Sequence, residues 1–388
     1  MKATSIHGKS PAEIKAALEK CLAGEQGFRP TLAIVFISVK QDRKAVCEIL
    51  NEQHIDIVGA TSSGEFTDTH QSDGEIVILL LDIRKEHYAI LFSETKNKNV
   101  EDAAREAADK ALSIFRNPAF ILCSTSIAEN GWLYDGANLV HSIREAAGGQ
   151  VQVFGAMSGD DGMLKSTYVF TATQSTDEGF VIWILDNDKI DLHGMAVSGW
   201  KPAGRIRTVT ECEGEWIYTI DDQPALDMYL RYLGQSLHTA ENTEKISISE
   251  EIGFHYPFLA IDAGEPSLRT PIEVNKEKNA IRMDKAIPQG KHLQFALPPD
   301  FDIVETVLDN ATSLKKEKKA EADALLIFSC LGRRIVLGPM VEQENEGLQK
   351  IWNVPLAGFY TYGEYGIDPD SDYLFHSTTC CWVALKEK

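Results

Sequence analysis

The chain lacks the features that mark membrane-spanning, secreted and zinc-knuckle proteins. Its longest apolar runs, Ile76 to Leu81 and Phe180 to Leu185, have the length of single strands and are too short to span a bilayer. The N-terminal residues do not contain the apolar segment of a signal peptide. The seven cysteines are an odd number and form no C-x-x-C pair, which argues against a disulfide framework. These absences predict a cytoplasmic protein without membrane insertion.

Positive charge is also scarce. The 388 residues include 38 Lys plus Arg and 58 Asp plus Glu, which gives a net charge of −20. The acidic residues are scattered and no basic stripe is present, so nucleic acid is not an expected partner. A hydrophobic content of 44% with 25% charged residues is typical of a globular protein, and the length allows two or three domains.

Several short catalytic and phosphate-binding motifs are missing. The chain contains no G-x-x-x-x-G-K-[ST] and no G-x-G-x-x-G sequence, so nucleotide binding by those routes is unsupported. The sequence GAMSG places Ser158 one position late for a nucleophile elbow. The metal-binding pairs H-E-x-x-H and H-x-x-H are absent too.

What the chain does contain is one short unit in three copies. Each copy has an apolar strand, a helical stretch, a second apolar strand and a turn with two glycines and a carboxylate. The three copies end in the turns IVGATSSGEF, VFGAMSGDD and PLAGFYTYGEYG. The glycines and acids of these turns are Gly59, Gly64 and Glu65 in the first, Gly155, Gly159 and Asp160 in the shorter second, and Gly358, Gly363 and Glu364 in the third.

The three copies predict an α/β fold. Strands separated by a helix imply β-α-β crossovers, and the strand-rich segment between residues 167 and 297 adds antiparallel hairpins, among them one formed by residues 180–185 and 190–197. We expect two packed α/β halves built from repeated β-α-β units, residues 1–220 with two copies and residues 221–388 with the third. The polar segment 236–251 is a candidate junction or mobile loop.

The turns are where a ligand is expected, and we expect them to converge around a shared cavity open to solvent. Exposed amides after a strand can hold a small anion or polar ligand, and the acids can receive an amine or a hydroxyl. The expected ligand-binding residues are Gly64, Glu65, Asp160, Asp161, Arg333, Gly363 and Glu364, with Trp200, Tyr360 and Tyr362 as aromatic walls. An alternative is that the glycines only shape tight turns and the acids cap backbone amides.

Two further possibilities concern a cofactor and a nucleophile. His193, His255 and His376 lie in apolar stretches, and a neutral imidazole in an apolar pocket can ligate haem iron; without C-x-x-C-H this would be haem b. Each histidine can equally be a core or turn residue. An enzyme, a hydrolase or transferase, would use Cys330, followed by Arg333 and Arg334, or a strand-end serine, which is Ser38, Ser124 or Ser329. A buried cysteine beside a surface arginine pair is the alternative.

These motifs together resemble the FIST proteins, bacterial and archaeal proteins with an N-terminal and a C-terminal FIST domain. The resemblance covers most of the chain. It rests on IVGATSSGEF, VFGAMSGDDG followed by TYVF, SGWKPAG, IDDQPALDMYLRYLG, FSCLGRR and VPLAGFYTYGEYG. One departure is Ser377 in FHSTT, where the family pattern has asparagine.

The resemblance implies a FIST N-terminal domain in residues 1–220, a FIST C-terminal domain in residues 221–388, and signal sensing in a bacterial cytoplasm rather than catalysis. Relatives are often encoded beside histidine kinases or fused to them, and a subset looks like the NosP-type nitric-oxide sensors, which bind haem. The chain is therefore expected to be a stand-alone sensor of a small ligand, either an amino-acid-like molecule or haem with nitric oxide. It would signal through a partner such as a histidine kinase.

Overall fold

The computed structural model describes residues 1–388 except 25–26, 235–251, 263–264, 301 and 369–373, so the segment 236–251 lies outside the described residues. The chain forms two compact units. The first holds Met1–Val197, Val304–Arg334 and Pro339–Lys388, and the second holds Ser198–Ile303 and Ile335–Gly338. The expected boundary between residues 220 and 221 separates two family domains in the sequence. The compact units are each built from more than one segment of the sequence, so they do not test this boundary, which stays a prediction.

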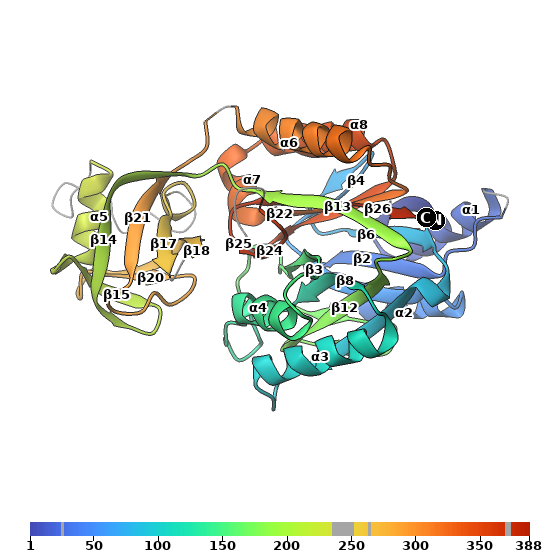
Figure 1. Cartoon of the computed structure of the whole chain (residues 1–388), viewed down its shortest axis with the longest axis horizontal. Helices are drawn as coiled ribbons and strands as arrows, with labels where there is room; N and C mark the ends of the chain where they lie inside the picture. The colour runs from blue at the N-terminus through green and yellow to red at the C-terminus, as the bar shows by residue number, and fades with distance from the viewer. Residues whose placement is uncertain (25–26, 235–251, 263–264, 301, 369–373) are drawn as a thin grey trace. The chain divides into compact units, whose positions relative to one another are not determined.

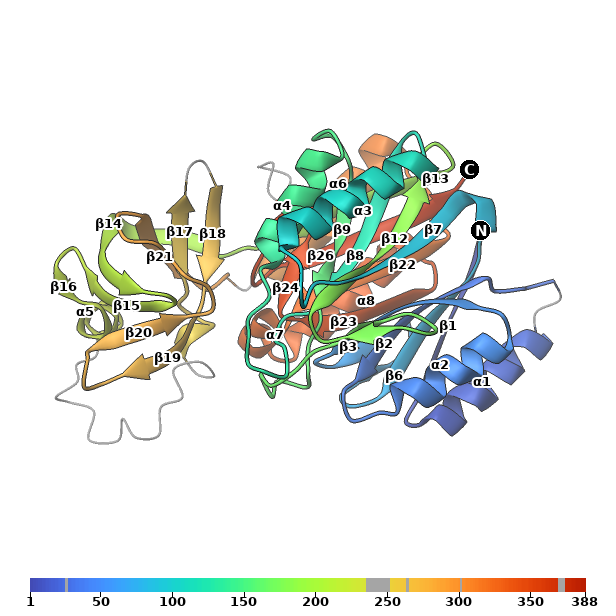
Figure 2. The same ribbon diagram turned by 90° about the horizontal axis from the view of Figure 1, so that it is seen from below.

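The first unit is built from three repeats with the same order of strands, and the third repeat has one additional helix (Figures 1 and 2). The first repeat contains β1 (Lys2–Gly8), α1 (Pro11–Gly24), β2 (Leu32–Ser38), α2 (Arg43–Glu52), β3 (Asp56–Ser62), β4 (Glu65–Thr67), β5 (Gln71–Ser72) and β6 (Ile76–Asp82). The second contains β7 (Tyr88–Glu94), α3 (Val100–Ile114), β8 (Pro118–Ser124), α4 (Gly136–Ala146), β9 (Val153–Met157), β10 (Val169–Phe170), β11 (Ser175–Thr176) and β12 (Gly179–Asp186). The third contains β13 (Ile190–Val197), α6 (Ile303–Lys318), β22 (Ala324–Cys330), α7 (Leu331–Leu337), α8 (Met340–Trp352), β23 (Leu356–Thr361), β24 (Gly363–Tyr365), β25 (Phe375–His376) and β26 (Cys380–Glu387).

The two apolar strands of each copy pair in parallel, as β2 with β3, β8 with β9, and β22 with β23. Side-chain caps begin the connecting helices: the Ala45 amide donates to Asp42 at 3.0 Å and the Asn138 amide donates to Asp135 at 3.1 Å. Helix α1 is capped in a similar way, since the Glu13 amide donates to the Ser10 hydroxyl at 3.3 Å. The α/β fold class with repeated β-α-β units is confirmed.

Each six-stranded sheet of the first unit is completed by the repeat next to it. The sheets have the orders β1-β6-β2-β3-β10-β11, β25-β24-β9-β8-β12-β7 and β13-β26-β22-β23-β4-β5. The strand that follows the first turn joins the third repeat, the one after the second turn joins the first repeat, and the one after the third turn joins the second repeat. This cyclic exchange ties the three repeats into one body and carries each turn across a boundary between repeats.

The first glycine of each turn makes room for this exchange. Phe170 lies opposite Gly59, Phe66 opposite Gly358, and Tyr365 opposite Gly155. A Cβ at Gly59 or Gly358 would lie 2.2 Å from the facing ring, and one at Gly155 would lie 1.9 Å from the Leu122 carbonyl oxygen. These three glycines therefore have a packing role.

The core of the first unit gathers apolar side chains from all three repeats. The ring of Phe36 packs against Phe328 and Phe359 with centroid distances of 6.1 and 4.4 Å. Helices α3 and α4 pack on the second repeat's sheet (Figure 2), and α1 and α2 on the first. Fully burying side chains of this size stabilises the fold by roughly 1.5–3 kcal/mol each. Within the described residues, no helix combines the length and apolar character needed to cross a lipid bilayer.

The hairpin expected from residues 180–185 and 190–197 is wrong. Strand β12 pairs with β7 and β8, whereas β13 pairs with β26 in another sheet. The three-residue turn between them carries the chain from the second repeat to the third. A local turn signal does not specify a partner when both strands are apolar enough to be buried in either sheet.

The second unit is inserted in the sequence of the third repeat, between β13 and α6. Its elements are β14 (Lys201–Glu213), β15 (Trp216–Ile220), β16 (Gln223–Pro224), α5 (Ala225–Tyr232), β17 (Phe258–Asp262), β18 (Glu265–Arg269), β19 (Pro271–Asn275), β20 (Ala280–Met283) and β21 (His292–Leu297). Strands β14 and β15 form one of its antiparallel hairpins. Tyr229, Phe258 and Phe295 stack in its core.

Candidate functional site

The three turns meet inside the first unit. The Ser63 amide donates to the Tyr360 carbonyl at 2.9 Å, the Gly159 amide to Thr61 at 2.9 Å, and the Tyr362 amide to Met157 at 3.3 Å. Each of these hydrogen bonds joins the turns of two different repeats. The expected convergence of the turns is confirmed.

The space between the turns is filled by their own side chains. Ser62, Glu65, Asp160, Thr361 and Glu364 are all buried there. Two hollows that the described residues form lie elsewhere. One, of about 520 Å³, lies in the second unit and is bordered by Tyr218, and the other, of about 450 Å³, lies beside α6 at Lys315. The expectation of a shared cavity open to solvent between the turns stays a prediction.

The acids of the first and third turns are held in the same way. Glu65 accepts hydrogen bonds from the Ser62 hydroxyl and, at 3.1 Å, from the Glu75 amide. Glu364 accepts hydrogen bonds from the Thr361 hydroxyl and from the Thr379 amide at 3.1 Å. Each acid thus fastens its turn to the residue that precedes the last strand of its repeat.

Burial dominates the protonation of these two acids. Removal from water raises the pKa of Glu65 to about 8 and that of Glu364 to about 7, although the hydroxyl and amide donors work in the opposite direction. Both side chains have no exposed surface. They are internal titratable groups in the wall of the site.

The acid of the second turn organises a loop. The Asp160 carboxylate accepts hydrogen bonds from the amides of Leu164, Lys165 and Ser166 at 2.9, 2.6 and 3.0 Å, and from the Tyr362 hydroxyl. The structure therefore brings Asp160 and Tyr362 together, as the turns predict. Their contact fixes the segment that begins with Asp161.

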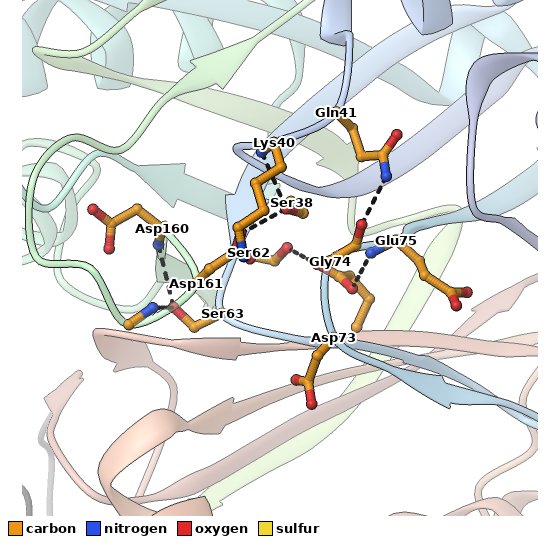
Figure 3. A network of polar contacts seen from close by, with 12 residues as sticks. Ser38, Lys40, Gln41, Ser62, Ser63, Asp73, Gly74, Glu75, Asp160 and Asp161 are labelled. Carbon is orange, nitrogen blue, oxygen red and sulfur yellow. Dashed lines mark hydrogen bonds and ion pairs between the residues drawn. The ribbon is translucent and has the colours of Figure 1, made fainter.

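Asp161 carries an incompletely satisfied carboxylate (Figure 3). One oxygen, Oδ2, accepts a hydrogen bond from the Ser38 hydroxyl at 2.7 Å and forms an ion pair with Lys40 at 3.1 Å. The other, Oδ1, is buried without a hydrogen-bond partner. The residue also has a φ of 58°, which is uncommon for a residue other than glycine. A buried polar atom without a partner and an unusual backbone conformation are both typical of functional sites.

A second charged group borders the first turn. The Arg334 guanidinium donates to the Ser63 carbonyl at 3.3 Å, pairs with Asp73 at 2.5 and 2.9 Å, and lies 4.4 Å above the Tyr360 ring. A Cβ at Gly64 would lie 2.6 Å from Arg334, and Gly64 has a φ of 111°. Only glycine fits this backbone beneath the ion pair. Gly64 and Tyr360 thus both lie against the Arg334 side chain at the edge of the first turn.

Arg333 and Cys330 lie in the interior instead. The Arg333 side chain is fully buried and bonds Glu344 through two nitrogens, at 2.6 and 3.2 Å. Burial and the Glu364 carboxyl raise the pKa of the Cys330 thiol far above its usual range. This thiol stays protonated at neutral pH, which is the opposite of nucleophile activation. A ligand contact by Arg333 stays a prediction, and its contacts give it a structural role.

The remaining predicted residues are spread over the two units. Trp200 belongs to the second unit, where it packs with Leu268 and Ala296. In the first unit, a Cβ at Gly363 would lie 3.0 Å from both Met157 and Phe375. Gly363 is thus tightly enclosed.

The three histidines differ in their surroundings. The His376 ring nitrogen Nε2 lies 2.9 Å from the Gly366 carbonyl oxygen. His193 is half-buried near the charges of Asp191, Lys318 and Lys388. The Nδ1 atom of His255, in the second unit, is buried without a hydrogen-bond partner. Of the three, His255 fits an axial ligand best, because haem iron needs a ring nitrogen that is not committed to another bond.

Sequence reasoning did not assign Lys40, Asp73 or Arg334 to the site. Lys40 follows the strand end at Ser38 by two residues, and Arg334 is the neighbour of the predicted Arg333. The position of Ser38 at a strand end was a usable signal. Nothing local marks Asp73, which reaches Arg334 across 261 residues of sequence.

Comparison with known proteins gives two findings. Residues 31–223 match the FIST N domain and residues 225–367 match the FIST C domain. An uncharacterized protein of Methanocaldococcus jannaschii is 22% identical, and the alignment covers 98% of this chain and 74% of that protein. FIST domains are associated with sensing and signal transduction.

Proposed function

The chain belongs to the FIST family, and we propose that it is a cytoplasmic sensor that binds a small polar ligand at the rim of the converging turns. It signals through a partner protein such as a histidine kinase, as the association of FIST domains with signal transduction suggests. The cytoplasmic location agrees with the cysteines: all seven lie among the described residues and none of them forms a disulfide. The observation that carries the ligand site is the unpartnered Oδ1 of Asp161.

The charges at the rim suit an amino-acid-like ligand. Lys40 and Arg334 can receive a carboxylate, while Asp161 and Asp73 can receive an ammonium group. The Lys40–Asp161 pair is the natural point of entry because 65% of the Lys40 side chain is exposed. Lys40 holds only one oxygen of the buried Asp161 carboxylate, so a ligand ammonium can replace Lys40 there or bind the other oxygen. The displaced lysine is then free to bind the ligand's carboxylate.

In this proposal, most of the other predicted residues hold the turns and the loop that form the ligand site. Tyr360 forms an aromatic wall under Arg334. Asp160 and Tyr362 hold the loop that carries Asp161. Glu65 and Glu364, with Gly64 and Gly363 beside them, fix the first and third turns. Trp200 and Arg333 stay predicted contributors.

A thermal-shift screen of amino acids followed by calorimetric titration tests the proposal. Asp161→Asn removes the carboxylate charge, and Lys40→Ala removes the ammonium group; each is expected to weaken binding at least about tenfold, since a hydrogen bond to a charged group is worth about 1.5–3 kcal/mol. Lys44→Ala is the matched control, because Lys44 is 87% exposed on α2. A ligand that binds all three variants like the unaltered protein would place the site elsewhere.

The haem version makes a separate prediction. Haem b would be ligated by His255, the candidate whose unpartnered ring nitrogen is buried. Titration of the protein with haem should then produce a Soret band that His255→Ala shifts or abolishes. The lack of a Soret band in the unaltered protein would remove the haem version and leave the amino-acid ligand standing.

One observation favours an enzyme as a second candidate. The Ser38 hydroxyl lies 2.7 Å from the Asp161 carboxylate, within reach for proton transfer. A hydrolase would use Ser38 as its nucleophile, whereas the raised pKa of the Cys330 thiol makes Cys330 unsuited to that role. Covalent labelling of Ser38 by a serine-directed fluorophosphonate, lost in Ser38→Ala, would support this candidate, and an unlabelled Ser38 would count against it.

A further inference from the structure

A cluster of three metal-ligating side chains lies in the first repeat. His7 belongs to β1, His70 lies between β4 and β5, and Glu75 immediately precedes β6. One ligand atom from each lies within 4.8 Å of the other two. The His7 and His70 rings stack with centroids 4.0 Å apart, and His70 Nε2 lies 2.8 Å from Glu75 Oε2. The ligand site proposed above uses none of these side chains.

We propose that His7, His70 and Glu75 bind one divalent transition-metal ion of the zinc type. Two imidazoles and one carboxylate are a common ligand set for Zn²⁺, whereas Mg²⁺ and Ca²⁺ prefer oxygen ligands alone. Three protein ligands leave the fourth position of a tetrahedral ion for water. The inference goes beyond the sensor function and does not depend on it.

The distances are close to those of a formed site. Zinc binds histidine nitrogen and carboxylate oxygen at about 2.0–2.2 Å, so the ligand atoms of a tetrahedral ion lie roughly 3.3 Å apart. The present separations run from 2.8 Å to at most 4.8 Å and bracket this value.

The cluster is peculiar to one repeat. His7 lies opposite Val77, and the corresponding pairs are Phe92 with Val181 and Ala196 with Cys381. The equivalent positions are thus apolar in the two other repeats. The fold of a repeat therefore does not require a histidine at the position of His7. A function specific to the first repeat explains the presence of His7 better than a structural role does.

A metal ion here would act on the turn region. The Glu75 amide donates to Glu65 at 3.1 Å, and the Ser38 amide donates to the Glu75 carbonyl at 3.0 Å. Fixing the Glu75 side chain on an ion would therefore stiffen the backbone that holds both the first turn and the strand end at Ser38. The ion would also link His7 in β1 to Glu75, which precedes β6.

Titration of the chelator-treated full chain with Zn²⁺ tests the proposal. We expect one ion per chain at pH 7.5, and at least about tenfold weaker binding in His7→Gln and in His70→Asn, since loss of even an outer-shell partner costs 10- to 100-fold. His141→Ala is the matched control, because His141 is exposed on α4. Co²⁺ in place of Zn²⁺ should give visible absorption bands that the two variants lose and the control keeps.

Two results would overturn the proposal. One is no saturable Zn²⁺ binding by the unaltered chain, and the other is equal affinity in His7→Gln, His70→Asn and the unaltered chain. Unchanged far-ultraviolet circular dichroism of the variants shows that a loss of binding is not a loss of fold. Asp161→Asn should keep its Zn²⁺ affinity, which separates this site from the ligand site at the turns.

Discussion

The protonation of Glu65 makes the stability of this protein depend on pH. In the unfolded chain the carboxyl ionises near its ordinary pKa of 4.5, whereas burial raises its pKa in the folded protein to about 8. Between these values the unfolded chain releases a proton that the folded chain keeps. The unfolded state then binds fewer protons, so the free energy of unfolding falls as pH rises from about 4.5 to about 8 and levels off above that.

The size of the effect follows from the two pKa values. Their difference corresponds to roughly 5 kcal/mol over the whole range, at 1.36 kcal/mol for each pKa unit. Between pH 5 and pH 8 the expected loss from Glu65 is about 3–4 kcal/mol. Glu364, with a pKa of about 7, adds a smaller loss of the same sign. His7 and His193, whose pKa values are lowered, act in the opposite direction.

Comparison of Glu65→Gln with the unaltered protein isolates the contribution of Glu65, because the other titrating groups are common to both. Urea unfolding at pH 5, 6, 7 and 8 should show that the variant gains about 3–4 kcal/mol relative to the unaltered protein across this range. Glu48→Gln is the matched control, since that side chain is 63% exposed on α2. If the curves of Glu65→Gln and the unaltered protein run parallel, Glu65 is ionised in the folded state and held by the Ser62 and Glu75 donors, and the reasoning is refuted.

Two further predictions concern packing and charge in the interior. Gly358→Ala places a Cβ 2.2 Å from the Phe66 ring and should lower the free energy of unfolding in urea by about 1–3 kcal/mol or more, whereas Gly24→Ala, with no atom within 4 Å, should not. Equal stability of the two variants would contradict the packing role of Gly358. Arg333→Met leaves Glu344 buried without its partner and should cost about 3–5 kcal/mol, most of which the double variant Arg333→Met/Glu344→Met recovers. A double variant as unstable as the single one would show that the loss does not come from the unpaired charge.

The repeats could be predicted from the sequence because each one is a local pattern. Apolar runs separated by amphipathic helices specify β2, β3, β22 and β23 without knowledge of the rest of the chain. The exchange of strands between repeats could not be predicted, because β4, β10 and β24 are only two or three residues long and carry no partner signal. The hairpin of β12 and β13 was wrongly expected because the apolar sequences of these two strands do not specify the sheet that each one joins. Pairing is a property of the assembled core rather than of the segment.

The site was predictable only where its residues follow strand ends. Asp161 was found because it lies in a repeated turn, and Ser38 because it ends β2. Arg333 was chosen over Arg334, and neighbouring residues on a helix point about 100° apart. Which of them faces the turns depends on how α7 packs, and the sequence does not contain that information. The cluster of His7, His70 and Glu75 spans three segments and matches no short motif.

The three-fold repetition itself separates scaffold from function. Features shared by the repeats, such as the glycines that face Phe66, Phe170 and Tyr365, have packing explanations. Functional chemistry should therefore be sought where the repeats differ, since a binding site for one small molecule has no use for three equal copies. The second turn differs by being one residue shorter, and it alone leads into Asp161, with its positive φ and its unpartnered oxygen. The first repeat differs by having His7 where the others have apolar residues, so both proposed sites lie where the repetition fails.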